Sequence, residues 1–167
     1  KNYDIYFAVN YDHSLTSMEL DQAVHYVFNA TEVLNWVVIQ TGSRYVLSTQ
    51  HYHSENDFRS ATPLRNMRID IFNEQLLAKY YIDEGNHRIE FLIHHLVFDG
   101  DSLYELLDKI EKVVVRKEKL SIEEQKYESL IALSPSNEVN GYRDAIESLP
   151  NRRRVSVQLA EPFYDNR

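Results

Sequence analysis

Two segments of the chain change from a strand-like to a helix-like pattern of apolar residues, and this change limits the fold more than any other feature. Apolar residues first alternate with other residues, which gives a strand one apolar face. They then recur at intervals of three and four, as on the buried side of an amphipathic helix. The two segments cover about residues 3–33 and 88–114. We therefore expect helices packed against a sheet.

In the first half of the chain, the pattern predicts a strand from Tyr3 to Val9. A helix is predicted to follow, because Thr16 and Glu19 have the spacing of a capping box, and to run to about Val33. The next apolar runs, at residues 36–39 and 45–48, are rich in β-formers and are separated by Thr41-Gly42-Ser43, which predicts a hairpin. Residues 50–61 are polar and indicate a loop.

In the second half, three apolar runs predict a meander of antiparallel strands at residues 67–72, 76–82 and 89–93. The clearest helix is predicted to be capped by Ser102, with Glu105 as its capping-box partner, and to end near Val114. Weaker signals favour further elements, namely helices at residues 121–133 and 138–149 and a strand at residues 155–159.

Composition excludes several classes of protein. The 167 residues suit a single domain, and 43% of them are hydrophobic, enough to bury a core. The net charge of −8 and the pI near 5.3 argue against binding to nucleic acid or to an anionic membrane. The absence of cysteine excludes disulfides, thiolate metal sites and a cysteine nucleophile. Since no apolar run approaches the ~20 residues of a membrane span, we expect a soluble cytoplasmic protein.

The segment His94-His95-Leu96-Val97-Phe98-Asp99-Gly100 has the most chemical content, because it lies between a predicted strand and a predicted helix. His95 shares a strand face with apolar residues, so its imidazole is expected to be desolvated, neutral and able to act as a general base. His94 should face the other way and be buried and hydrogen-bonded. Asp99 is expected to brace the loop by accepting backbone N–H bonds or by pairing with an arginine. Gly100 is able to take a positive φ at the turn into the helix.

The length of this motif makes it specific. With 7 histidines in the chain, a histidine four residues before an aspartate is expected by chance about 0.5 times. Adding the second histidine and the glycine lowers this expectation to roughly 0.0005.

The segment, with Ser102 shortly after it, resembles the HHxxxDG motif of condensation domains in nonribosomal peptide synthetases, which are relatives of chloramphenicol acetyltransferase. Residues 31–35 lie where such domains carry a His-Glu-x-Leu-Arg stretch, and Pro63-Leu64 matches their Pro-Leu pair. The resemblance covers about Tyr3 to Val115.

The resemblance implies an α+β fold with a mixed, mainly antiparallel sheet and helices packed on one face. Residues 1–167 would form a single lobe, the N-terminal one of a two-lobed domain whose C-terminal lobe is its partner. Peptidyl or acyl carrier proteins would present both substrates on phosphopantetheine arms, with no cofactor bound directly, and the reaction would form an amide bond. His95 would position or deprotonate the acceptor amine, and Asp99 would hold the loop. The isolated lobe is expected to be inactive.

One departure concerns Asp99. The family's arginine, which pairs with this aspartate, is replaced by Asn35, so Arg65 or Arg68 is the alternative partner. We predict no metal site, because the neighbouring side chains of His94 and His95 point to opposite faces of a strand. Three alternatives stay open: an epimerisation domain, a lobe that docks carrier proteins without catalysis, and a stand-alone acyltransferase. The sequence leaves the substrates open.

Overall fold

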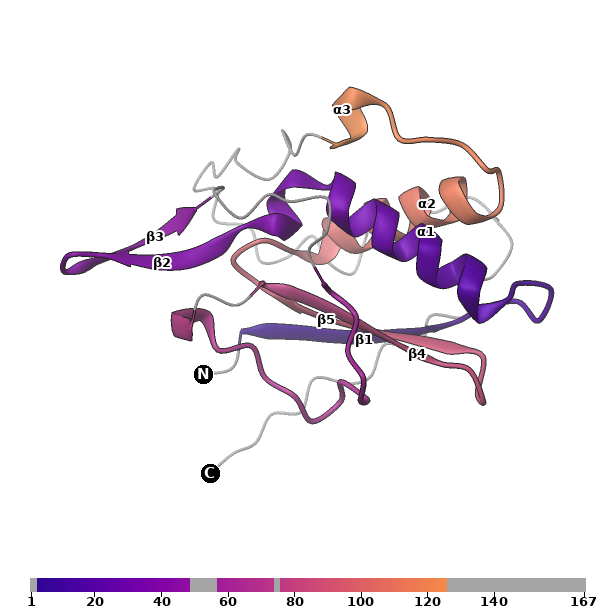
Figure 1. The fold of residues 1–167 in the computed structure, drawn as a ribbon, viewed down its shortest axis with the longest axis horizontal. Helices are drawn as coiled ribbons and strands as arrows, with labels where there is room; N and C mark the ends of the chain where they lie inside the picture. The colour runs from indigo at the N-terminus through magenta and orange to yellow at the C-terminus, as the bar shows by residue number, and fades with distance from the viewer. Residues whose placement is uncertain (1–2, 49–56, 74–75, 126–167) are drawn as a thin grey trace, which may run out of the picture.

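The computed structural model describes residues 3–48, 57–73 and 76–125, and its centre is a three-stranded antiparallel sheet. The sheet consists of β1 (Asp4–Asn10), β4 (Ala78–Asp83) and β5 (Arg88–His94), in the order β1-β5-β4 (Figure 1). Phe91 of β5 lies opposite Phe7 of β1 and Tyr80 of β4. The strand that ends in the histidine pair is thus the central one.

Both long helices cover one face of this sheet, as Figure 1 shows. They are α1 (Ser17–Ala30) and α2 (Gly100–Val114), which pack against each other as well. Their apolar stripes bury Val24, Val27 and Phe28 from α1 and Leu106 and Ile110 from α2. The predicted capping box of Thr16 and Glu19 is present at the start of α1.

The opposite face of the sheet is partly covered by the segment 57–73, which crosses it below the strands in Figure 1. Two carboxylates of the sheet hold this segment: Glu90 Oε2 accepts from the Leu64 amide at 2.8 Å, and Asp4 Oδ2 from the Ile69 amide at 3.2 Å. Near the start of the segment, Arg59 forms a parallel bridge with Tyr80. The three strands pair antiparallel, the single bridge at their edge is parallel, and both long helices lie on one face, so the predicted α+β fold class is confirmed.

Smaller elements complete the described part of the chain. The predicted hairpin consists of β2 (Val37–Thr41) and β3 (Arg44–Ser48), and its turn contains Gly42 with a φ of 63°. Short helices are η1 (Glu32–Asn35), η2 (Ile71–Asn73) and α3 (Ile122–Gln125). At the start of α3, the Ser121 amide donates to Glu124 Oε2 at 2.6 Å and the Glu124 amide donates to Ser121 Oγ at 3.2 Å. The predicted helix at 138–149 and strand at 155–159, and most of the helix at 121–133, lie outside the described residues.

Three local predictions are wrong. The first helix ends at Ala30 rather than Val33, because the chain tightens there into η1. Residues 67–72 do not form a strand; they belong to the crossing segment, and Asp70 accepts from the Phe72 amide at 3.1 Å and stabilises the turn of η2. The predicted meander is therefore reduced to the antiparallel pair of β4 and β5, and β5 has β1 as its other neighbour.

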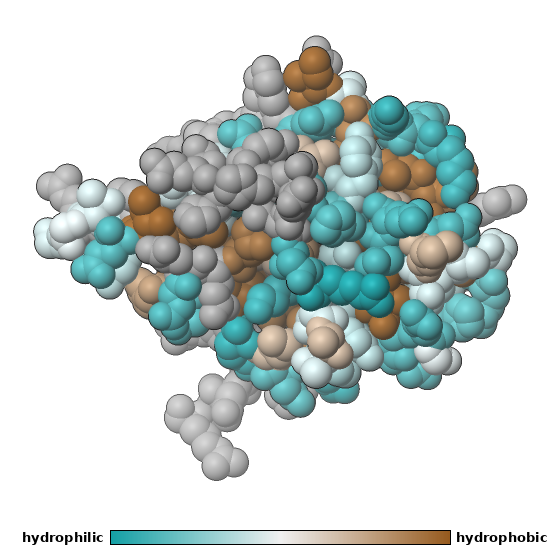
Figure 2. Space-filling model, in the orientation of Figure 1, coloured by the Kyte–Doolittle hydropathy of each residue, from teal (hydrophilic) through white to brown (hydrophobic). Residues whose placement is uncertain are grey.

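The surface carries both polar and apolar side chains. On the face shown in Figure 2, hydrophilic residues separate the hydrophobic patches. Within residues 3–48, 57–73 and 76–125, none of the helices has the length and apolar character needed to cross a membrane.

Candidate active site

Hydrogen bonds to both neighbouring segments hold the histidine pair at the end of β5. The His94 amide donates to the Leu77 carbonyl at 2.8 Å, and the His95 amide donates to the Tyr3 carbonyl at 2.8 Å. The two backbone positions are therefore bonded on opposite sides, one toward β4 and the other toward β1. A central strand positions side chains more rigidly than a loop does.

His94 has the structural role that the sequence predicted. Its side chain is buried, and its Nδ1 accepts a hydrogen bond from the Leu96 amide at 3.1 Å. With Nδ1 as the acceptor, the neutral ring carries its proton on Nε2. Burial lowers the pKa of His94 below its ordinary value, and the nearby Asp4 carboxylate partly opposes this shift. The buried His94 ring thus stabilises the turn by this hydrogen bond to the Leu96 amide.

His95 is exposed, which contradicts the expectation of a desolvated imidazole. The strand ends at His94, so His95 is the first residue of a turn and leaves the packed layer. Beside its ring is an open hollow of about 470 Å³. The described residues that line this hollow are Tyr3, Ile71, His94, His95 and Leu96. The described residues therefore place this imidazole beside the hollow and leave it open to water.

The loop after the histidines is anchored by apolar packing. Val97 and Phe98 are both buried, and the Phe98 ring stacks on Phe7 of β1 with centroids 5.9 Å apart. The Val97 amide also donates to the His94 carbonyl at 3.1 Å. The loop between β5 and α2 is therefore part of the core, and it leaves only Leu96 and His95 exposed at its tip.

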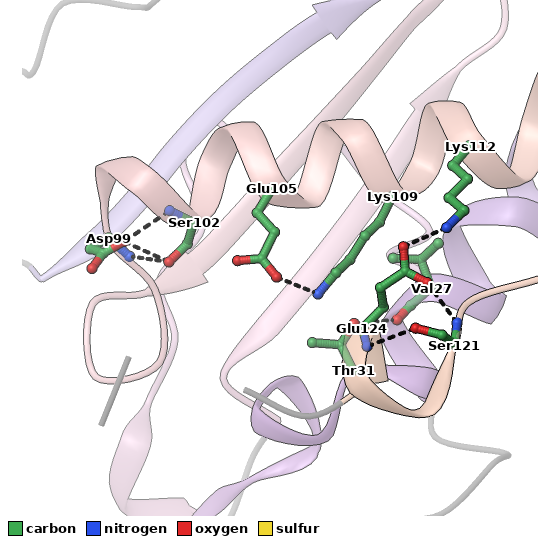
Figure 3. A network of polar contacts seen from close by, with 9 residues as sticks. All are labelled: Val27, Thr31, Asp99, Ser102, Glu105, Lys109, Lys112, Ser121 and Glu124. Carbon is green, nitrogen blue, oxygen red and sulfur yellow. Dashed lines mark hydrogen bonds and ion pairs between the residues drawn. The ribbon is translucent and has the colours of Figure 1, made fainter. Parts of the chain in front are cut away.

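Asp99 caps α2, whereas the sequence pattern predicts Ser102 as the cap. Asp99 Oδ1 accepts from the Ser102 amide at 2.9 Å and from Ser102 Oγ at 2.6 Å, while Ser102 Oγ accepts from the Asp99 amide at 3.3 Å (Figure 3). The helix consequently begins at Gly100, three residues before the predicted first turn. Gly100 is its first residue and does not have a positive φ.

The predicted partners of Asp99 are not found beside it. Within the part of the chain that the structure describes, Asp99 forms no ion pair with an arginine. Arg65 is exposed, and Arg68 donates to the Met67 carbonyl at 2.8 Å. The prediction of an Asp99 pair with Arg65 or Arg68 is wrong, because both arginines lie on the segment that crosses the far face of the sheet. Capping by Ser102 satisfies the Asp99 carboxylate instead.

Asn35, which stands where the family has arginine, is completely buried. Its Nδ2 lies 3.0 Å from the Phe28 carbonyl, 3.2 Å from the Asn29 carbonyl and 2.9 Å from the Thr31 carbonyl. Carbonyls at the end of a helix lack partners within the helix. Asn35 therefore closes the C-terminal end of α1, and the departure from the family pattern has a structural explanation.

An ion pair on α2 between a buried lysine and a partly exposed glutamate was not predicted from the sequence. The Lys109 side chain is 6% exposed, and its Nζ lies 2.6 Å from Glu105 Oε1 (Figure 3). Lys109 and Glu105 border a small space of about 10 Å³ together with Thr31 at the end of α1. Further along, Lys112 pairs with Glu124 and joins α3 to α2. The i,i+4 spacing of Glu105 and Lys109 is a signal for the pair, but burial of the lysine has no signature in the sequence.

The charged side chains do not suggest a metal centre. In residues 3–48, 57–73 and 76–125, no three histidine, aspartate or glutamate side chains are grouped so that they could hold a metal ion. Chemically, the site offers one accessible imidazole at the rim of an apolar hollow. Such a group is able to accept a proton from, or donate a hydrogen bond to, a molecule in the hollow.

No protein-family model matches the chain, and no curated protein matches it in sequence. Solved structures do match. The SgcC5 protein from Streptomyces globisporus has a TM-score of 0.52 at 12% identity, over 71% of this chain and 32% of that one. A structure described as the molecular basis for condensation domain-mediated chain release from the enacyloxin polyketide synthase has a TM-score of 0.55 at 11% identity, over 71% and 26%. The chain has a condensation-domain-like fold.

A third structure supports the same conclusion. The tallysomycin biosynthesis protein TlmII has a TM-score of 0.52 at 13% identity, over 77% of this chain and 37% of that one. The chain spans only about a quarter to just over a third of the length of these structures. At such identities the likeness concerns the fold, and activity has to be argued from the site.

Proposed function

We propose that the chain is the N-terminal lobe of a condensation domain that joins a donor acyl or peptidyl thioester to an acceptor aminoacyl thioester. The observation that carries this proposal is the exposed His95 imidazole beside an open hollow, at the end of a central strand in a condensation-domain-like fold. Carrier proteins would present both substrates on phosphopantetheine arms.

In the proposed reaction, the acceptor amine attacks the thioester carbonyl. A C–N bond forms, the C–S bond breaks, and the proton lost by the amine is returned to the leaving thiolate, which departs as a thiol. His95 orients the amine or takes up its proton during the attack. Holding two tethered reactants together in the right orientation lowers the activation barrier by up to about 7 to 11 kcal/mol. His95 would then raise the reaction rate by a further factor of about 100 to 10,000.

The exposure of His95 supports a second lobe over the hollow. A general base works best in a site from which water is excluded, and the described residues leave this imidazole open. The C-terminal lobe of the same domain would close the hollow and complete the site. On this proposal the 167-residue chain alone has no turnover.

The test is peptide formation by the native protein that contains this chain, with loaded carrier proteins as substrates. His95→Ala and His95→Gln are expected to lower the rate by about 100-fold or more. His13→Ala is the matched control, because His13 is an exposed histidine that follows the other end of β1. Full activity of His95→Ala would refute the proposed role of this imidazole.

A second candidate function is a lobe that binds carrier proteins without catalysis. It is favoured by the buried Asn35 and by the capping role of Asp99, since the arginine pairing of the family is absent from the described residues. Carrier-protein binding that His95→Ala leaves unchanged, with no turnover by the native protein, would select this candidate. An epimerisation domain is distinguished by inversion of the α-carbon in the released product.

A further inference from the structure

Asp4, the first residue of β1, lies directly opposite His94 in the antiparallel pairing of β1 with β5. Residues paired in this way point to the same face of a sheet, with their Cβ atoms about 4.5 to 5.5 Å apart. The Asp4 carboxylate is therefore beside the His94 imidazole, and its negative charge acts on the ring. The sequence pattern gives Asp4 no role, because the register of the two strands cannot be read from it.

The same carboxylate holds the segment that crosses the far face of the sheet. Asp4 Oδ2 accepts from the Ile69 amide at 3.2 Å. The neighbouring residue in the chain, Tyr3, accepts from the His95 amide through its carbonyl at 2.8 Å. Asp4 is itself half-buried, so its charge is felt more strongly than it would be in bulk water. One side chain thus joins the crossing segment to the strand end that carries both histidines.

The hydrogen bond from the Leu96 amide to His94 Nδ1 requires one form of the ring. Nδ1 accepts only when it carries no proton, so the neutral ring has its proton on Nε2. With a proton on Nδ1, two N–H groups would face each other and the bond would be lost. Because the Leu96 amide already occupies Nδ1, the N–H that a neighbouring carboxylate can stabilise is the one on Nε2. The charge of Asp4 therefore favours the form of the ring that the turn needs.

Asp4 is the acidic group that acts on the His94 ring within the described part of the chain. Burial of the ring lowers the pKa of His94, the Asp4 carboxylate opposes this shift, and the His95 imidazole adds to it. The centroid of the Tyr3 ring lies 6.4 Å from that of His94. On the crossing segment, Asp70 is exposed and accepts from the backbone amide two residues later.

We infer that Asp4 is a positioning residue, which holds the His94 ring in the form that accepts from the Leu96 amide and thereby fixes the turn that presents His95. The effect on catalysis rests on the proposed function, whereas the control of the His94 ring rests on the contacts at the strand end alone. Asp4 acts through His94 and does not itself take part in the reaction.

The first experiment follows the ring nitrogens of His94 by ¹⁵N NMR in the 167-residue chain while the pH is varied. Asp4→Asn removes the charge, but its side-chain oxygen is still able to accept from the Ile69 amide. Loss of the negative charge is expected to move the titration of His94 to lower pH. Asp4→Ala is expected in addition to speed hydrogen exchange at the Leu96 amide about tenfold, the effect of losing one hydrogen bond, with circular dichroism used to verify folding.

Asp12→Asn is the matched control. Asp12 is an exposed aspartate beyond the other end of β1, and its Oδ1 accepts from the Ser14 amide at 2.8 Å. This variant is expected to leave the titration of His94 unchanged. An unchanged titration of His94 in Asp4→Asn, or an equal shift in the two variants, would overturn the inference.

The second experiment measures peptide formation by the native protein that contains this chain. Asp4→Asn is expected to lower kcat several-fold with little change in KM, because the imidazole is less well positioned while the substrates still bind. Asp12→Asn is expected to keep the full rate. A full kcat in Asp4→Asn together with a shifted titration of His94 would overturn the positioning role.

The inference and the proposed function fail separately. Full peptide formation in His95→Ala would refute the proposed role of His95, while the titration of His94 in the 167-residue chain would still decide whether Asp4 controls that ring. Loss of peptide formation in His95→Ala together with an unchanged titration in Asp4→Asn would overturn the inference about Asp4 alone.

Discussion

Replacement of the buried Asn35 with alanine is expected to lower the free energy of unfolding by about 2 to 3 kcal/mol. The Asn35 amide has two N–H groups, which it shares among the carbonyls of Phe28, Asn29 and Thr31. The Thr31 carbonyl also accepts from the Leu34 amide at 3.1 Å, so it keeps a partner in the variant. Phe28 and Asn29 lose the Asn35 bond, and each lost buried bond costs about 1 to 1.5 kcal/mol.

The assay is urea unfolding of the chain followed by far-UV circular dichroism. The expected result is a lower transition midpoint with an unchanged dependence of the free energy on urea, because the variant exposes the same surface on unfolding. Asn10→Ala is the matched control, since Asn10 is exposed at the end of β1, and it is expected to change stability by no more than about 0.5 kcal/mol. If Asn35→Ala were as stable as Asn10→Ala, Asn35 would not close α1.

Three further predictions concern the other residues around the site. Asp99→Ala is expected to lower stability by about 1 kcal/mol in the same urea assay while Asp99→Asn retains most of it, and equal losses would contradict the capping role. The lowered pKa of His94 means that the unfolded chain binds the proton more tightly, so the stability of the fold should decrease as the pH drops below about 6.5. His94→Gln should reduce this pH dependence of stability, and an identical pH profile in the variant would contradict the prediction. Glu90→Gln should speed hydrogen exchange at the Leu64 amide several-fold because a neutral acceptor is weaker, whereas Glu84→Gln at an exposed position should not; unchanged exchange would show that Glu90 does not hold the crossing segment.

Features that depend on neighbours in the chain were predictable from the sequence. The capping box of Thr16 and Glu19 and the hairpin around Gly42 follow from residue types at fixed spacing, and the structure contains both. The start of α2 was misplaced because two pairs compete there: Ser102 with Glu105, and Asp99 with Ser102. The second pair prevails, since it lets Phe98 stay packed on Phe7 directly before the cap.

Features that depend on distant contacts were not predictable. The alternation at residues 67–72 resembles a strand, but the segment finds its partners in two carboxylates of the sheet rather than in another strand. Burial of Asn35 and Lys109 likewise depends on how α1, η1 and α2 meet. For the site, the sequence indicated that the side chains of His94 and His95 point in opposite directions. The exposure of His95 was not predictable, because it depends on where β5 ends.

The position of β5 in the middle of the sheet has a consequence for the motions available to the site. A strand with hydrogen-bonded neighbours on both sides and buried side chains along nearly its whole length opens only when the surrounding unit unfolds. The backbone of β5 up to His94 should therefore be among the slowest of the described residues to exchange its amide hydrogens. Movement at the hollow is then left to the side chains at its rim, while the strand beneath them stays in register.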